Sequence, residues 1–153
     1  MAWREGEVTC YAALTRDSVA TKEASKICVN LKMYEFIGQL ILVVEDEPLV
    51  RQVAQLMLES ADFTVITAED ARAALIALQA HPSVSLIVSD VQMPGCLDGL
   101  ELIKHLRGEG VKTPAILTSG RIFPEQLPEA TTFLVKPYSL KTLLDKVNEA
   151  AKR

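Results

Sequence analysis

The chain has 153 residues, of which 49% are hydrophobic and 24% are charged, a size and composition typical of one globular domain and not of a disordered chain. Its formal net charge of −4 excludes the strongly basic face that nucleic-acid binding usually requires. No apolar run approaches the roughly 20 residues that span a membrane, and three cysteines are too few for a disulfide framework or a zinc cluster. These features predict a cytoplasmic domain with reduced thiols that contacts neither nucleic acid nor membrane.

Residues 1–38 differ from the rest of the chain in their charge balance. They hold five Lys or Arg and five Asp or Glu, whereas residues 39–153 hold eleven and fifteen and carry the whole net charge. Apolar residues at helical spacing favour a helix over about 18–36. The alternatives are a flexible leader or an extension upstream of a start at Met33. We therefore divide the chain into an N-terminal extension, 1–38, and a domain, 39–153.

From Gln39 onward, short apolar runs alternate with longer segments of helical period. The runs are rich in Val, Ile, Leu and Thr, which is typical of strands covered on both faces. They are Leu40–Val44, Phe63–Ala68, Leu86–Val88 with Asp90 after it, Ala115–Ser119 and Thr132–Val135, and the helical segments are Pro48–Ala61, Asp70–His81, Asp98–Gly108 and Ser139–Lys152. Five strands alternating with helices predict an α/β fold, with a mostly parallel sheet covered by helices on both faces.

The stretch where a fourth helix would be expected breaks this pattern. Residues 121–130 are few, and they include Pro124 and Pro128. Proline in the interior of a helix costs roughly 3 kcal/mol. We therefore expect a single turn or an irregular loop there, that is, a degenerate fourth helix.

Polar residues follow the strands at their carboxyl ends, where parallel sheets bind ligands. They are Glu45-Asp46-Glu47 after the first strand, Asp90 at the end of the third, Thr118-Ser119 at the end of the fourth and Lys136-Pro137 after the fifth. Taken singly, each has an ordinary explanation as a helix-start acid, a turn residue, a strand-end hydroxyl or a solvated lysine. Together, however, the carboxylates would repel one another unless a cation neutralised them, and Mg²⁺ accepts such oxygen ligands. A lysine and a hydroxyl beside them suit a phosphoryl group.

These segments, in this order, resemble the receiver domain of two-component response regulators. The matching motifs are Ile41–Pro48 (ILVVEDEP), Val88–Gly95 (VSDVQMPG) followed by Asp98-Gly99-Leu100, Leu117–Gly120 (LTSG) and Phe133–Tyr138 (FLVKPY). The resemblance covers residues 39–153. It implies a flavodoxin-like, doubly wound sheet of five parallel strands in the order 2-1-3-4-5.

The resemblance also implies a role for several residues of the site. Asp90 would be the phosphoacceptor, taking a phosphoryl group from a phosphohistidine on a sensor histidine kinase or a phosphotransfer protein. Mg²⁺ would be held by Asp46, Asp90 and the backbone carbonyl of Gln92, with Glu45 acting mainly through water.

The resemblance implies roles for three further residues, which would bind the phosphoryl group or change position in response to it. Lys136 would contact the phosphoryl oxygens from a loop fixed by a cis Lys136–Pro137 bond. Thr118 would be the switch hydroxyl. Phe133 would be the switch aromatic, where tyrosine is commoner.

The expected function is signalling by protein–protein contact, as a stand-alone receiver without an attached effector domain. Its downstream target is unknown from the sequence, and a monomer or weak homodimer is expected because the usual dimer face is rebuilt around 121–130. No enzymatic activity is expected beyond self-phosphorylation and autodephosphorylation. One alternative is a receiver-shaped scaffold that does not switch. Another is an aspartate-dependent phosphatase, which Gln92 disfavours because such enzymes place a second aspartate there.

Overall fold

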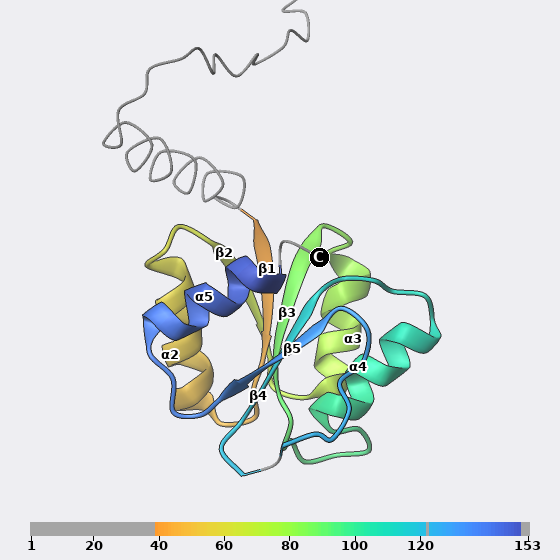
Figure 1. The fold of residues 1–153 in the computed structure, drawn as a ribbon. Coiled ribbons are helices and arrows are strands. Elements are labelled where there is room, and N and C mark those ends of the chain that lie inside the picture. Colours follow the sequence, from red (N-terminus) through yellow and green to blue (C-terminus); the bar gives the residue numbers. More distant parts are fainter. Residues whose placement is uncertain (1–38, 122, 151–153) are drawn as a thin grey trace, which may run out of the picture. The chain divides into compact units, whose positions relative to one another are not determined.

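The computed structural model describes residues 39–121 and 123–150. The N-terminal extension, with the helix expected over about 18–36, lies outside the described residues. Within the described part, five strands alternate with helices (Figure 1). The elements are β1 (Leu40–Val44), α2 (Pro48–Glu59), β2 (Thr64–Ala68), α3 (Ala71–Ala80), β3 (Val84–Asp90), α4 (Gly99–Gly108), β4 (Ala115–Ser119), β5 (Thr131–Val135) and α5 (Leu140–Ala150).

The strands form one parallel sheet in the order β2-β1-β3-β4-β5, which confirms the predicted fold. Most element boundaries lie within one or two residues of those predicted. The differences of two residues include the end of α2, at Glu59 instead of Ala61, and the start of the third strand, at Val84 instead of Leu86. The early start of β3 has a tertiary cause. Its first residues pair with β1 across a register shift next to Leu40, which the local apolar pattern does not reveal.

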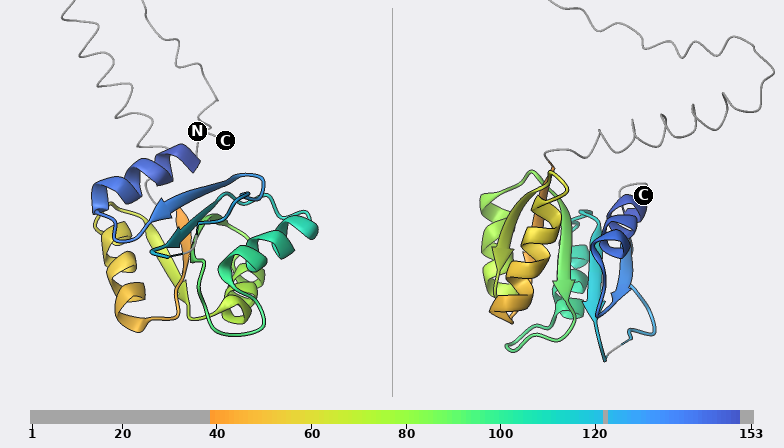
Figure 2. Two further views of the ribbon diagram at one scale, coloured as in Figure 1. Left: turned by 60° about the horizontal axis from the view of Figure 1, so that its bottom comes forward. Right: turned by 90° about the vertical axis from the view of Figure 1, so that its left-hand side faces the viewer.

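The two faces of the sheet are covered by different helices (Figure 2). On one face, Ile41 and Val43 of β1 pack with Leu58 of α2 and Val147 of α5. On the other face, residues of α3 and α4 pack against the alternate side chains of the same strands. The strand side chains thus alternate between two cores, which explains why the strands are apolar on both sides.

The helices begin at residues suited to that position. Pro48 occupies the first turn of α2, where its missing N–H costs nothing. Asp70 accepts a hydrogen bond from the Ala73 N–H at 2.7 Å, and Asp98 forms a capping box with Glu101 at the start of α4. These caps fix the starts of the helices that follow the carboxyl ends of β2 and β3, and so fix the rim of the sheet.

The connection between β4 and β5 contains no helix among its described residues, as the two prolines predict. The Arg107 side chain of α4 holds the end of this connection, donating from Nε to the Glu129 carbonyl at 2.7 Å. Its Nη2 donates at the same time to the Thr113 carbonyl, in the loop between α4 and β4, at 2.9 Å. Near the start of the connection, the ring of Phe123 lies 5.6 Å from that of Phe133. The loop is therefore tied to α4 and to β5 by single side chains.

Candidate functional site: an acidic cluster at the carboxyl edge of the sheet

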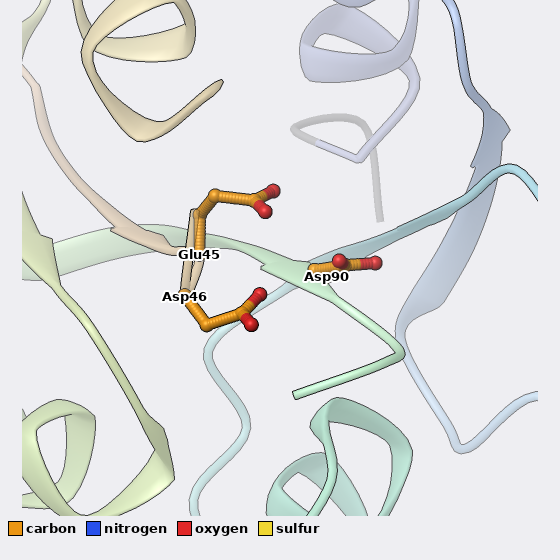
Figure 3. A group of neighbouring side chains, drawn as sticks. All are labelled: Glu45, Asp46 and Asp90. Atoms are coloured by element: carbon orange, nitrogen blue, oxygen red, sulfur yellow. The ribbon is translucent and has the colours of Figure 1, made fainter. Parts of the chain in front are cut away.

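Three carboxylates converge where β1 and β3 end. Glu45 and Asp46 directly follow β1, and Asp90 is the last residue of β3. The two strands are neighbours, with Val44 paired with Ser89. One ligand oxygen from each of the three side chains lies within 4.8 Å of the others, and Figure 3 shows the three carboxylates facing a common space. The predicted clustering of Glu45, Asp46 and Asp90 is therefore present in the structure.

Lys136 brings a positive charge to the same cluster. Its Nζ lies 2.6 Å from Oε2 of Glu45 and 3.1 Å from Oδ2 of Asp90. The lysine follows β5 directly, and its N–H donates to the Ser119 carbonyl at 2.9 Å, so the strand pairing sets its position. The Lys136–Pro137 bond is cis, as the resemblance implied.

Burial and charge shift the pKa values of this pair. Burial raises the pKa of Glu45 above 4.5, although the hydrogen bond and the charge of Lys136 oppose the rise. For Lys136, burial lowers the pKa, but the hydrogen bonds and charges of Glu45 and Asp90 outweigh burial and raise it above 10.5. The cluster thus has three carboxylates, of which the Lys136 ammonium pairs with two, those of Glu45 and Asp90. The cluster carries an excess of negative charge that a bound cation would neutralise.

Thr118 lies one strand away from the acidic cluster, paired with Asp90 across β3 and β4. Its side chain is buried, and its hydroxyl donates to the Ser89 carbonyl at 3.5 Å. The backbone of Val91 donates to the Thr118 carbonyl at 2.8 Å. Thr118 therefore lies beside the predicted phosphoacceptor, with its hydroxyl directed to the main chain of β3.

The loop after Asp90 is packed tightly against α4. The N–H of Gln92 donates to Oδ1 of Asp90 at 3.3 Å, so the main chain of Gln92 lies beside the carboxylate. The N–H of Gly99 donates to the Val91 carbonyl at 3.0 Å. A Cβ atom on Gly99 would lie 1.8 Å from the Asp90 carbonyl oxygen. The start of α4 can therefore reach Asp90 only through a glycine.

Phe133 is the predicted site residue that the structure places apart from the carboxylates. It is half-buried on the face of the sheet that packs against α3 and α4, and its ring contacts Phe123 of the β4–β5 connection. The sequence alone indicates no partner for Phe133. The contact joins the strand that carries Lys136 to the loop that follows Thr118.

Two further residues of the site were not assigned a role from the sequence. Gly99 was quoted only as part of a motif, and its close approach to Asp90 depends on the tertiary packing of α4. Arg51, in α2, donates from Nη1 to the carbonyl oxygens of Glu45 and Asp46. A lone arginine on a helix carries no signal of such a contact, although its spacing of six residues from Glu45 puts it within reach.

The acidic cluster, Lys136 and Thr118 all lie at the carboxyl edge of a five-stranded parallel sheet, which is where α/β domains of this kind bind ligands. Residues 41–148 match the response regulator receiver domain family. The chain therefore belongs to the receiver domains of two-component response regulators, as the resemblance implied.

Curated relatives agree with this assignment. The chain is 34% identical over 115 residues to the C4-dicarboxylate transport transcriptional regulatory protein DctD of Pseudomonas aeruginosa, covering 72% of this chain and 24% of that protein. It is 33% identical over 118 residues to the transcriptional regulatory protein FixJ of Bradyrhizobium diazoefficiens, covering 74% and 57%. The match spans less than two thirds of either relative.

Solved structures show the same fold. The receiver domain from the hybrid histidine kinase CckA is 37% identical, with a TM-score of 0.64, and the match covers 73% of this chain and 98% of that one. The chemotaxis protein CheY4 of Vibrio cholerae is 31% identical, with a TM-score of 0.66 and coverage of 74% and 98%.

Among the described residues, no helix is long and apolar enough to cross a membrane.

Proposed function

We propose that the chain is a phosphoacceptor, which takes a phosphoryl group from a phosphohistidine onto Asp90 and signals by contact with other proteins. The observation that carries this proposal is the position of Asp90, which shares Lys136 with Glu45 and faces Asp46. Asp90 is mostly buried, and its carboxylate lies beside those of Glu45 and Asp46 at the carboxyl edge of the sheet (Figure 3).

The transfer is a displacement at phosphorus. A carboxylate oxygen of Asp90 forms the new P–O bond while the P–N bond to the imidazole breaks, and the bond's electrons return to the ring nitrogen of the departing histidine. Positioning and charge compensation dominate such a step. Lys136, whose Nζ lies 3.1 Å from Oδ2 of Asp90, offsets negative charge on the incoming phosphoryl oxygens.

The side chains of the cluster fit a magnesium ion. Their ligand atoms are all oxygens that lie within 4.8 Å of one another, and hard divalent cations prefer such donors. Asp46, Asp90 and the carbonyl of Gln92 would hold Mg²⁺, with Glu45 acting mainly through water. When bound, the ion supplies neutralisation of the negative charge on the phosphoryl oxygens and the carboxylates.

The response to phosphorylation is proposed to begin at Thr118. Its hydroxyl makes a long hydrogen bond of 3.5 Å to the Ser89 carbonyl, which is easily exchanged for a stronger acceptor such as a phosphoryl oxygen. The same movement would shift the start of the β4–β5 connection, and with it the contact between Phe123 and Phe133. We propose these groups as the switch.

The proposal extends to the partners. We propose that the chain acts in the cytoplasm and that its phosphodonor is a sensor histidine kinase or a histidine phosphotransfer protein, the partners with which receiver domains interact. We propose no turnover of an external substrate, only self-phosphorylation and autodephosphorylation. The output is contact with a further protein, from a monomer or a weak homodimer.

A small phosphodonor tests the proposal without a known kinase. The full chain is incubated with acetyl phosphate and Mg²⁺, and its intact mass is measured. We expect the wild type to gain one phosphoryl group and Asp90→Asn to gain none. Glu69→Gln, which changes an exposed acid after β2, is the matched control and should be labelled like the wild type. The proposal would be overturned if Asp90→Asn gained a phosphoryl group, or if the wild type gained none.

A further inference from the structure

The loop between β1 and α2 consists of three residues, and two of them carry the carboxylates of the site. The last hydrogen bond between the backbones of β1 and β2 comes from the N–H of Glu45, which donates to the Ala68 carbonyl at 3.1 Å. Beyond this point, the directions of the two carboxylates depend on the backbone torsions of the loop. Because α2 begins at Pro48, little regular hydrogen bonding is available to fix them.

Arg51 supplies the missing contacts. Its Nη1 donates to the Glu45 carbonyl oxygen at 2.5 Å and to the Asp46 carbonyl oxygen at 3.3 Å. The Glu45 residue is only 5% exposed, so its carbonyl cannot rely on solvent and needs a protein donor. The guanidinium thus holds the two successive carbonyl groups of the residues whose side chains form the acidic cluster.

We propose that Arg51 is a positioning residue for the acidic site, which sets the backbone of Glu45 and Asp46 so that both carboxylates face Asp90. The inference rests on the proposed function, because its measurable consequence is the affinity of the site for Mg²⁺. Arg51 acts through the main chain. It does not need to touch the ion or the phosphoryl group.

The chemistry of the contact explains why the residue is an arginine. One terminal nitrogen with two N–H groups serves both carbonyls, at the end of a long and planar side chain. The ammonium of lysine stands one bond closer to the backbone, so it can keep at most part of the contact. Methionine has a similar apolar stem but no donor. The series arginine, lysine, methionine therefore removes the contact in steps.

The positioning role and a simple charge effect predict opposite changes in Mg²⁺ affinity when Arg51 is replaced. A positive charge beside the cluster repels a cation, so its removal alone would tighten Mg²⁺ binding. Loss of the carbonyl contacts, in contrast, lets the loop relax and spreads the two carboxylates over several directions, which weakens Mg²⁺ binding. Loss of a residue that orients metal ligands typically costs roughly 10–100-fold in affinity.

The experiment measures Mg²⁺ affinity by isothermal titration calorimetry on the full chain. We expect Arg51→Met to bind roughly tenfold more weakly than the wild type, and Arg51→Lys to fall between them. Arg72→Met is the matched control, because Arg72 is an exposed arginine in the first turn of α3 at the same rim. It should bind Mg²⁺ as the wild type does.

A second readout separates positioning from a general loss of stability. The melting temperature is measured with Mg²⁺ and with chelator, because an ion that binds only the folded state raises it. We expect the rise caused by Mg²⁺ to shrink in Arg51→Lys and further in Arg51→Met. A purely structural role would lower both melting temperatures and leave the rise unchanged.

The positioning role and the proposed function fail on different results. The positioning role is overturned if Arg51→Met binds Mg²⁺ as tightly as the wild type or more tightly. If Arg51→Met does not fold, it is overturned if Arg51→Lys binds Mg²⁺ as tightly as the wild type. Failure of the wild type itself to bind Mg²⁺ contradicts the proposed function instead.

Discussion

The ammonium of Lys136 lies 2.6 Å from Oε2 of Glu45, joining the loop after β5 to the loop after β1. The side chain of Glu45 is 6% exposed and that of Lys136 is 21% exposed, so water compensates little if one partner is lost. The same ammonium also contacts Asp90. This shared cation connects three strands of the sheet at the site, and its removal should affect stability and chemistry together.

Lys136→Met should lower the free energy of unfolding by about 2 kcal/mol, the typical worth of a hydrogen bond to a charged group. It should also slow labelling by acetyl phosphate, because no ammonium then faces the phosphoryl oxygens. Urea unfolding and intact mass measure the two effects. Lys141→Met, which breaks an exposed pair with Asp145 on α5, is the control and should change neither.

A double-mutant cycle tests whether the loss of stability in Lys136→Met comes from its pairing with Glu45. In a chain that already carries Glu45→Gln, Lys136→Met should lower the free energy of unfolding by less than it does in the wild type. The reason is that the single variant Lys136→Met leaves the buried Glu45 carboxylate unpaired, whereas the double variant has no carboxylate there. Equal costs of Lys136→Met with and without Glu45→Gln would contradict the assignment.

Gly99→Ala should destabilise the protein by about 3 kcal/mol, because the new methyl group would lie 1.8 Å from the Asp90 carbonyl oxygen and must displace β3 or α4. Gly108→Ala is the matched control. A Cβ atom added to Gly108 would meet nothing within 4 Å, and alanine at a compatible helical position stabilises by about 0.4–1 kcal/mol. Urea unfolding of both variants decides between a steric requirement at Gly99 and a general intolerance of glycine changes.

Arg107→Met should destabilise the protein by about 2 kcal/mol, because several backbone carbonyls lose a charged donor at once. The pKa of Arg107 is lowered by burial, which the charge of Glu129 partly offsets, so the guanidinium is not a simple surface charge. Limited proteolysis should cut 121–130 faster in this variant. Lys104→Met, which removes the same charge at an exposed position of α4 outside the cut segment, should leave the rate unchanged.

The Tyr138 phenol gives a prediction at alkaline pH. Burial raises its pKa above 10.0, assisted by the charges of Glu45 and Asp90 and opposed by that of Lys136. A pKa that is higher in the folded state than in the unfolded state contributes stability below the unfolded value, and this contribution is lost as the pH rises through the folded value. The wild type should therefore lose stability above pH 10 more steeply than Tyr138→Phe.

Phenolate absorbance checks the direction of this shift. The difference between the titrations of the wild type and Tyr138→Phe isolates one tyrosine, and its midpoint should lie above 10.0. A midpoint at or below that value would show that the phenol is solvated.

Much of the fold could be predicted from the sequence, because each strand is a short apolar run and the helices have apolar stripes and begin at a capping residue or, in α2, at a proline. The prolines at 124 and 128 likewise sufficed to predict a turn or an irregular loop between β4 and β5, where the described residues form no helix. The start of β3 could not be predicted, since Val84 is held by pairing across an irregular register with β1. Pairing partners are long-range and leave no local trace.

The same division holds for the site. Glu45, Asp46, Asp90 and Lys136 could be identified because each stands at the carboxyl end of a strand, and parallel strands bring those ends together. The contacts of Arg51 and the close approach of Gly99 could not, because they depend on how α2 and α4 pack. The present direction of the Thr118 hydroxyl, toward Ser89, is also a tertiary detail.

The location of the phosphoryl group tests the central claim most directly. The wild type is labelled with acetyl phosphate and Mg²⁺ and reduced with borohydride, which converts an acyl phosphate on aspartate to homoserine. Its peptides are then sequenced by mass spectrometry. We predict homoserine at position 90 and none at position 46. Conversion at position 46, or none at position 90 in a chain that carries the phosphoryl group, would contradict the account.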